Sequence, residues 1–272
     1  MNKAILLGGT GIVLAFGMLA FGYMAGKPVP ALAGNAAPAV EQVADASSVN
    51  REEIEKIVRD YLLKNPEVLV EVQTALEEKQ KEEQRVAHLE VIKNAKDEIF
   101  NAAYDGYVGN PNGKVTIVEF YDYNCGFCKR AQDDMKALTA SNPDLRFVLK
   151  EFPILGPDSQ KASVVSMAFK KLLPEQHGEF HNRLLEAPGR ATEASAVKLA
   201  LSYGVDEAKL REEMKNPAIS DAYARTYDLA NKLSITGTPS YVVGNEVVFG
   251  ALGKEVLAEK IAEAANCGQA TC

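Results

Sequence analysis

The chain lacks an excess of positive charge. Its 272 residues include 30 Lys and Arg against 37 Asp and Glu, a formal net charge of −7, and there is no strongly basic patch. Because nucleic acids are held mainly through clustered Lys and Arg side chains, this composition argues against a nucleic-acid-binding protein. With 47% hydrophobic and 25% charged residues, the composition is that of a soluble globular protein.

The sequence also has few residues that bind metal ions. It contains four cysteines and three histidines, and no Met- or His-rich tract. A zinc site needs about four N or S ligands, and Cys267, Cys272, His88, His177 and His181 do not supply them at a suitable spacing. The two histidines four residues apart are more typical of surface or packed positions. We expect no metal and no cofactor.

A long uncharged run near the N-terminus indicates export. Residues 4–26 carry no charged side chain, and a small-x-small cleavage site follows at 31–33. Residues 1–33 are therefore interpreted as a signal peptide. At 1.5 Å per residue the run would also reach across the roughly 30 Å core of a bilayer, so an uncleaved membrane anchor is the alternative. Both place the rest of the chain in an oxidising compartment.

Composition then separates a linker from a helical segment. Residues 27–50 are rich in Pro, Ala, Gly and Ser without an apolar period, and the part beyond the cleavage site, 34–50, is expected to be a flexible linker. Residues 51–104 are rich in Glu, Lys, Gln, Leu and Val, with Asn50 as a candidate N-cap. Because Pro66 interrupts the apolar period, two helices are predicted.

The helical segment carries an apolar stripe that a compact domain further along is not obliged to cover. The stripe consists of Ile54, Ile57, Tyr61, Leu62, Leu69, Val72 and Leu76. Such a stripe is buried either against the rest of the chain or against another copy. We favour self-association into a dimer or trimer through residues 51–104, with packing along the compact domain as the alternative.

The compact domain is predicted over residues 113–265 and has an α/β pattern. Its elements are expected as strands over 114–121, 145–152, 238–243 and 247–249, helices over 131–140 and 254–265, and a helical insertion at about 158–234. Gly244 and Asn245, between the last two strands, are residue types that favour the tight turn of a β-hairpin. Residues 266–272 form a short tail.

The motif Cys125-Gly126-Phe127-Cys128 follows the first strand and opens a helix. A cysteine at that point faces unpaired backbone N–H groups and the positive end of the helix dipole, which favour the thiolate. Cys125 is therefore the predicted nucleophile. Cys128, one turn further in, is predicted to resolve the mixed disulfide by closing the Cys125–Cys128 bond. This pattern is typical of a thiol–disulfide oxidoreductase.

The residues around the motif resemble a known family. The stretch Phe-Tyr-Asp-Tyr-Asn-Cys-Gly-Phe-Cys at 120–128, followed after the insertion by Gly237-Thr238-Pro239, is similar to the DsbA family of bacterial envelope oxidoreductases. Residues 61–68 resemble the N-terminal region of the family branch that includes the oligomeric ScsC proteins. The resemblance implies a thioredoxin-like fold with an inserted helical domain, a periplasmic location, a cis peptide bond before Pro239 and exchange with protein substrates.

The same resemblance implies roles outside the cysteines. Glu119 corresponds to a buried acid that accepts the proton of the resolving thiol. Thr238 and Pro239, together with Gly126 and Phe127, would contact the substrate. Gly126-Phe127 replaces the Pro-His of the best-known oxidases, so the centre is expected to be less strongly oxidising, and Thr238 stands where they have Val. Both departures, like the N-terminal extension, favour isomerase or mixed activity.

Three functions stay open. The leading one is a disulfide isomerase, or a mixed isomerase and oxidase, acting on cysteines of exported proteins and kept reduced by a membrane redox partner. The second is a dedicated dithiol oxidase recycled by a quinone-linked membrane partner. The third is a copper(I)-binding protein, since soft thiolates such as Cys125 and Cys128 favour that ion. Cys267 and Cys272 form a possible second disulfide, or else a redox-active tail.

Overall fold

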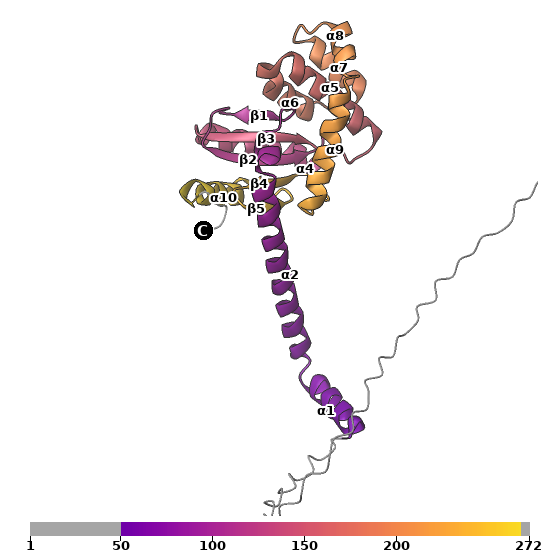
Figure 1. Ribbon diagram of the computed structural model, residues 1–272, viewed down its shortest axis with the longest axis vertical. Helices are drawn as coiled ribbons and strands as arrows, with labels where there is room; N and C mark the ends of the chain where they lie inside the picture. Colours follow the sequence, from indigo (N-terminus) through magenta and orange to yellow (C-terminus); the bar gives the residue numbers. More distant parts are fainter. Residues whose placement is uncertain (1–49, 268–272) are drawn as a thin grey trace, which may run out of the picture. The chain divides into compact units, whose positions relative to one another are not determined.

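A mixed five-stranded sheet forms the centre of the compact C-terminal part of the chain. The computed structural model describes residues 50–267, so the expected leader at 1–33, nearly all of the linker and the tail from residue 268 lie outside the described residues. The strands follow the spatial order β1-β3-β2-β4-β5 (Figure 1). They are β1 (Gly106–Gly109), β2 (Val115–Tyr121), β3 (Leu145–Glu151), β4 (Ser240–Val243) and β5 (Glu246–Phe249).

Helices α1, α2 and α3 precede the strands in the chain, and the other helices follow β2, β3 or β5. They are α1 (Arg51–Lys64), α2 (Glu67–Asn94), α3 (Lys96–Phe100), α4 (Gly126–Ser141), α5 (Pro157–Leu172), the 3-10 turn Pro174–Gln176, α6 (His177–Glu186), α7 (Glu193–Leu201), α8 (Glu207–Glu213), α9 (Pro217–Lys232) and α10 (Lys254–Cys267). No helix among those described is both long and apolar enough to cross a bilayer.

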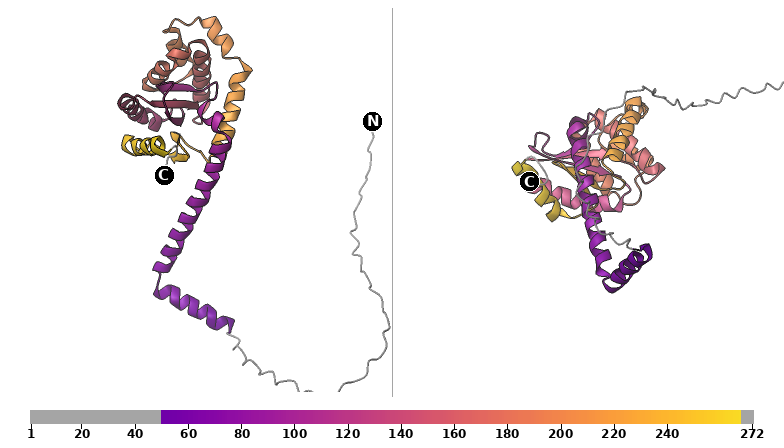
Figure 2. Two further views of the ribbon diagram at one scale, coloured as in Figure 1. Left: turned by 60° about the vertical axis from the view of Figure 1, so that its left-hand side comes forward. Right: turned by 60° about the horizontal axis from the view of Figure 1, so that its bottom comes forward.

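The central strand β2 is covered on both faces. Its sequence Val-Thr-Ile-Val-Glu-Phe-Tyr is rich in β-branched and aromatic residues, which suit a buried strand. It pairs in parallel with β3, through the crossover helix α4, and antiparallel with β4. Ile117 and Tyr121 face a core shared with α4, α5, α6 and α10, whereas Val118 and Phe120 face a core shared with the end of α2, α3 and α9 (Figures 1 and 2).

The insertion predicted between the second and third main strands is present. Helices α5 to α9 leave the sheet after β3 and return to it at β4. The hairpin of β4 and β5 turns at Gly244, whose φ of 56° suits a glycine. The prediction of an α/β, thioredoxin-like fold with an inserted helical domain is confirmed.

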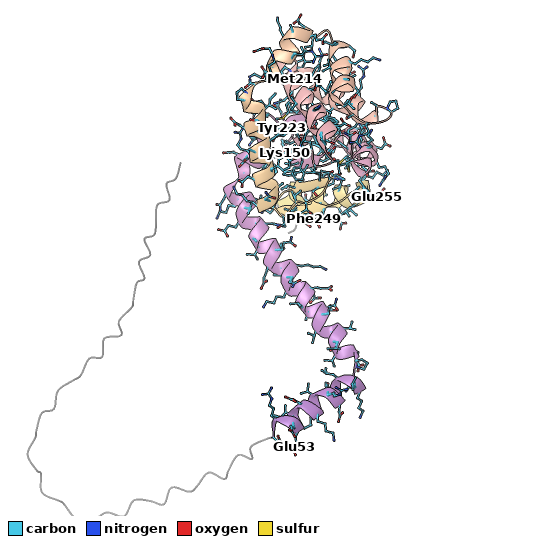
Figure 3. The ribbon with its side chains drawn as sticks, turned by 90° about the vertical axis from the view of Figure 1, so that its right-hand side faces the viewer. Glu53, Lys150, Met214, Tyr223, Phe249 and Glu255 are labelled. Atoms are coloured by element: carbon cyan, nitrogen blue, oxygen red, sulfur yellow. The ribbon has the colours of Figure 1, made fainter. Side chains whose placement is uncertain are left out.

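The predicted break between two N-terminal helices is also confirmed, because α1 ends at Lys64 and α2 begins at Glu67. Asn50 caps α1, its Oδ1 accepting a hydrogen bond of 3.2 Å from the backbone N–H of Glu52. Six of the seven stripe residues are at least 46% exposed; the other, Leu62, is half-buried. Side chains project outward along α2 (Figure 3).

The folded domain that contains the sheet begins before residue 113, where the compact domain was predicted to start. Strand β1, which pairs antiparallel with β3, was not predicted, because Gly-Tyr-Val-Gly is too short and glycine-rich to show a strand pattern. The last turns of α2 also pack on the sheet: Ile92 is 2% exposed, and the rings of His88 and Phe249 lie 6.2 Å apart. The segment before residue 113 therefore contributes to the core of the sheet unit.

Candidate active site

The turn between β2 and α4 positions the two cysteines of the motif. Cys125 is the N-cap residue of α4 and has an extended backbone conformation, while Cys128 lies in the first turn. Both are free thiols, and the residues are only 5% and 1% exposed. The structure therefore places a dithiol at the positive end of a helix.

The surroundings of Cys125 favour its thiolate. The pKa of Cys125 is lowered to about 5, first by a hydrogen bond from the thiol of Cys128 and further by the Thr238 side chain and the N–H groups of Cys128 and Phe127, against the opposing effect of burial. In the protonated state the Cys125 thiol donates to the carbonyl oxygen of Thr238 at 3.1 Å. Because several donors converge on one sulfur, Cys125 carries a negative charge at neutral pH.

Cys128 and Glu119 have the opposite character. Burial raises the pKa of Cys128, and the hydrogen bond to Cys125 and the charge of Glu119 raise it further. Glu119 lies on β2, is 4% exposed, and has its pKa raised to about 8 by burial and by the negative charge of Cys125. A carboxyl group with a pKa near 8 exchanges protons readily at neutral pH.

Thr238 and Pro239 lie beside Cys125 from the other end of the chain. The Thr238–Pro239 peptide bond is cis, as the resemblance implied. The 3.1 Å contact from Cys125 Sγ to the carbonyl oxygen of Thr238 fixes the two segments next to each other. The chain enters β4 directly afterwards, at Ser240. The site thus combines the start of α4 with the segment that leads into β4.

The two residues between the cysteines face solvent. Phe127 is 58% exposed, and the guanidinium of Arg130 lies 4.3 Å from the centre of its ring. A Cβ placed on Gly126 would have only the Arg130 side chain as a neighbour, at 3.9 Å. Gly126 therefore lies at an uncrowded position of the surface, and the exposed Phe127 supplies an apolar surface next to the cysteines.

Asp122 and Asn124, which the sequence analysis did not single out, hold the turn in place. The Asp122 carboxylate accepts hydrogen bonds from the N–H of Asn124 at 2.7 Å, the hydroxyl of Ser159 at 2.7 Å and the N–H of Leu155 at 2.9 Å. Asn124 exchanges two bonds with the backbone of Ala191, at 2.8 and 2.9 Å. The known tendency of Asp and Asn to bond nearby backbone groups was the available signal, but their partners in the insertion are distant in sequence.

Tyr241 is a third residue of the site that the sequence pattern did not single out. It lies directly opposite Glu119 in the β2–β4 pairing and is 1% exposed. Burial raises its pKa, and the charges of Glu119 and Cys128 raise it further. Tyr241 therefore helps to exclude water from the acid and the inner thiol.

The remaining candidate residues lie away from this site or outside the described side chains. His177 and His181 are buried and packed among aromatic rings, and His88 packs at the end of α2. Among residues 50–267 no three Asp, Glu, His or Cys side chains are grouped so as to hold a metal ion. The side chains of Cys267 and Cys272 lie outside the described part, so the second disulfide stays a prediction.

Comparison with protein families identifies the relatives of this chain. The model of the DSBA-like thioredoxin domain matches residues 116–262, more than half of the chain. The chain belongs to the DSBA-like thioredoxin family. Within this family member, residues 50–83 also match the model of the N-terminal domain of the copper resistance protein ScsC. The latter match covers all seven residues of the apolar stripe.

Solved structures place this DSBA-like protein among oxidoreductases. A thioredoxin-like oxidoreductase from Silicibacter pomeroyi DSS-3 is 34% identical, with a TM-score of 0.59, over 63% of this chain and 98% of its own. Proteus mirabilis ScsC in a compact conformation is 29% identical, with a TM-score of 0.60, over 79% of this chain and 97% of its own. The ScsC match therefore extends beyond the thioredoxin domain.

Curated relatives match over different shares of their length. The chain is 26% identical over 151 residues to disulfide bond formation protein D of Bacillus subtilis, covering 68% of that protein. It spans only 24% of the length of two Salinispora Na⁺/H⁺ antiporters that it also matches, at 25% and 24% identity. These matches support the assignment of the thioredoxin-like domain. The activity of the whole protein is inferred from its site.

Proposed function

We propose that this protein catalyses thiol–disulfide exchange on cysteine-containing protein substrates, with Cys125 as the attacking thiol. The observation that carries the proposal is the difference between two identical side chains: the pKa of Cys125 is lowered to about 5, whereas that of Cys128 is raised. One cysteine is ready to attack, and the other is held back as a thiol until a mixed disulfide forms. The family match supports the same reaction.

The proposed reaction proceeds in two steps. The Cys125 thiolate attacks one sulfur of a substrate disulfide, forms a mixed disulfide and releases the other substrate sulfur as a thiolate. In the mixed disulfide Cys125 has lost its negative charge, which lowers the pKa of Glu119 and favours its carboxylate. Cys128 then gives its proton to the Glu119 carboxylate and attacks Sγ of Cys125, which closes the internal disulfide and releases the second substrate thiolate. Two electrons pass from the protein dithiol to the substrate. The reverse sequence oxidises a substrate dithiol.

Substrate recognition is assigned to the open side of the site. Thr238 and Pro239 offer backbone groups next to Cys125, to which an extended substrate segment could bind by main-chain hydrogen bonds. Exposed Phe127 offers an apolar contact, and Gly126 adds no side chain to the exposed start of α4. A locally unfolded chain with a cysteine near apolar residues fits these features.

Isomerase or mixed isomerase and oxidase activity is the preferred form of the reaction. It is supported by the exposed apolar stripe and by the match of residues 50–83 to the ScsC N-terminal domain, both of which favour a homo-oligomer with several Cys125 sites. We assign residues 51–104 to this oligomerisation segment and residues 113–265 to catalysis. Residues 1–33 are assigned to export into the periplasm, where a membrane redox partner keeps the site reduced.

A dedicated dithiol oxidase is the second candidate, and one observation favours it. Stabilising the Cys125 thiolate stabilises the reduced form of the protein, which makes its disulfide a stronger oxidant. The pKa of about 5 is low despite the absence of a histidine between the cysteines. The redox state of Cys125 in cells separates the two candidates, since an isomerase is kept largely reduced and an oxidase largely oxidised.

Trapping of substrates tests the proposal. The Cys128→Ala variant cannot resolve mixed disulfides, so we expect it to accumulate covalent, dithiothreitol-sensitive complexes with exported proteins. Cys125→Ala is the matched control and should form none, because the buried Cys128 thiol does not attack. Equal trapping by both variants, or by neither, would contradict the assignment of Cys125 as the nucleophile.

A further inference from the structure

A hollow lies at the opposite end of the central strand from the cysteines. It has a volume of about 530 Å³ and lies among the end of α2, the end of α3, the beginnings of β2 and β3, the β4–β5 turn and α10. Ligand sites in proteins usually have volumes in this range. The seven residues of β2 at about 3.3 Å each place it roughly 20 Å from the active-site turn.

The charges around this hollow all have one sign. Lys93, Lys96, Lys114 and Arg146 line it, and no Asp or Glu side chain of residues 50–267 does. This contrasts with the chain as a whole, whose net charge is −7. Lys93 and Lys96 also border a neighbouring hollow where acidic residues lie, but Lys114 and Arg146 do not. Four cationic residues around one hollow, with no described carboxylate among them, make a site suited to an anion.

Arg146 is held in place for such a role. Its Nε donates to Thr116 Oγ1 at 3.3 Å, and one terminal nitrogen donates to the carbonyl oxygen of Phe100 at 3.0 Å and to Asn101 Oδ1 at 3.3 Å. A guanidinium has five N–H bonds, so the two on the other terminal nitrogen have no protein partner among the described residues. A half-buried, oriented Arg with a free pair of donors is suited to a carboxylate or phosphate.

The rest of the lining is largely apolar. Leu89 and Phe100 contribute side chains from the two helix ends, next to the charged groups. A purely inorganic anion would leave this surface in contact with water. A ligand with an anionic head and an apolar body would satisfy both parts of the lining, because its buried CH₂ groups are removed from water.

We propose that this hollow, named here the cationic pocket and defined by Lys93, Lys96, Lys114, Arg146, Leu89 and Phe100, binds an anionic amphiphile with a single carboxylate or phosphate and an acyl-like chain. The ligand comes either from solution, as a free fatty acid does, or from a membrane, as an anionic phospholipid does. Because the pocket is remote from Cys125, binding there leaves thiol–disulfide exchange intact.

Titration calorimetry with the full-length protein tests the head and the chain separately. Decanoate should bind at least ten-fold more tightly than acetate or inorganic phosphate, because only decanoate reaches the apolar lining. Lys96→Glu combined with Lys114→Glu should weaken decanoate binding at least ten-fold, since it reverses two of the four charges. Lys198→Glu combined with Lys209→Glu is the matched control, with the same change of net charge at exposed helical positions outside the pocket.

Vesicle flotation distinguishes the two sources of the ligand. Binding to phosphatidylglycerol vesicles, but not to phosphatidylcholine vesicles, that is lost in the pocket variant and kept in the control identifies a membrane lipid. Decanoate binding without vesicle binding identifies a free amphiphile. The proposal is overturned if decanoate and acetate bind equally, if neither decanoate nor vesicles bind, or if both charge-reversal variants lose binding alike. Unchanged insulin reduction by the pocket variant separates this test from that of the catalytic proposal.

Discussion

Cys125 and Cys128 carry the same side chain and differ only in what surrounds the sulfur atom. Cys125 receives hydrogen bonds from a thiol, a side chain and two backbone N–H groups, so its charged form is stabilised although the residue is buried. Cys128 lies deeper and near the Glu119 carboxyl group, so its charged form is destabilised. At Cys125 the hydrogen-bond donors stabilise the thiolate more than burial destabilises it. At Cys128 the effect of burial is larger, and the thiol stays protonated.

The titration of Cys125 should report the hydrogen bond from Cys128. In the wild-type protein we expect a single thiolate transition near pH 5, measured by absorbance at 240 nm, because Cys128 stays protonated to high pH. Cys128→Ala removes the largest stabilising contact and should raise the pKa of Cys125, whereas Cys128→Ser keeps a donor and should raise it less. A wild-type transition near the ordinary value of about 8.5 would contradict this account.

Replacing Thr238 by Val should make the Cys125 thiolate less stable. The Thr238 side chain is one of the groups that lower the pKa of Cys125, and a hydrogen bond to a charged group contributes about 1.5 to 3 kcal/mol. We expect the pKa of Cys125 to rise by roughly one unit and the glutathione redox equilibrium to shift about ten-fold toward the protein disulfide.

Thr238→Ser is the control for that substitution, because it retains the hydroxyl group. It should leave the pKa of Cys125 and the glutathione equilibrium close to those of the wild type. If the Val and Ser variants behave alike, the hydroxyl of Thr238 does not act on the sulfur and Thr238 contributes only through its backbone.

At the scale of elements, the helical insertion is joined to the sheet by polar contacts as well as by apolar packing. Asp122 and Asn124 bind Ser159 at the start of α5 and Ala191 before α7. Further along, Tyr123 bonds the hydroxyl of Ser166 on α5, which in turn bonds His177 on α6. The active-site turn thus depends on helices that are distant in the sequence.

The buried His177 should make the insertion sensitive to acid. Burial, reinforced by the charge of Lys170, lowers the pKa of His177 to about 3, below its value of about 6.5 in the unfolded chain. The unfolded state therefore binds a proton first, and stability falls as the pH drops from about 6.5 toward 3. The loss reaches at most about 4 to 5 kcal/mol. Urea denaturation at several pH values measures it.

His177→Gln isolates this contribution. The variant should be less stable than the wild type at pH 7.5, but the difference should shrink as the pH falls toward 4, because Gln does not titrate. Burial raises the pKa of Glu151 to about 7, which has the opposite effect on acid stability, so only the difference between the two proteins is informative. Parallel stability curves would show that His177 is not buried in its neutral form.

At the scale of the whole molecule, the N-terminal apolar stripe should control both assembly and isomerase activity. Each aliphatic side chain buried between copies contributes roughly 1.5 to 3 kcal/mol, so several together would hold an oligomer. Removing residues 34–83 should give a monomer that still reduces insulin but isomerises scrambled ribonuclease poorly, because neighbouring Cys125 sites no longer recapture the substrate at high effective concentration. The deletion ends before His88 and Ile92, which pack in the core.

A substitution in the intact chain provides the matched test. Ile57→Asp combined with Leu69→Asp keeps both helices and places charges on exposed stripe positions. Sedimentation velocity should show the same loss of assembly, with the same selective loss of isomerase activity. If the wild type is already monomeric at tens of micromolar, or if the monomeric variants isomerise normally, the stripe has another role and the oxidase becomes the preferred function.

Local pattern was enough to determine much of this protein from its sequence. The apolar run before Cys125 predicted β2, Pro66 predicted the break between α1 and α2, and the position of the motif predicted the strand-to-helix turn at which both cysteines lie. Each of these depends on residues that are neighbours in the chain, where propensity and backbone geometry act directly. The family resemblance lay in the same short stretches.

Only the tertiary structure determined which distant groups meet. It brought Thr238 to the sulfur of Cys125, placed Tyr241 opposite Glu119, paired β1 with β3, and packed the end of α2 on the sheet. It also gathered Lys114 and Arg146 with two lysines of the α2–α3 region around one hollow. These contacts join segments that are separated by tens of residues. They are determined by loop closure and core packing, which no local sequence pattern encodes.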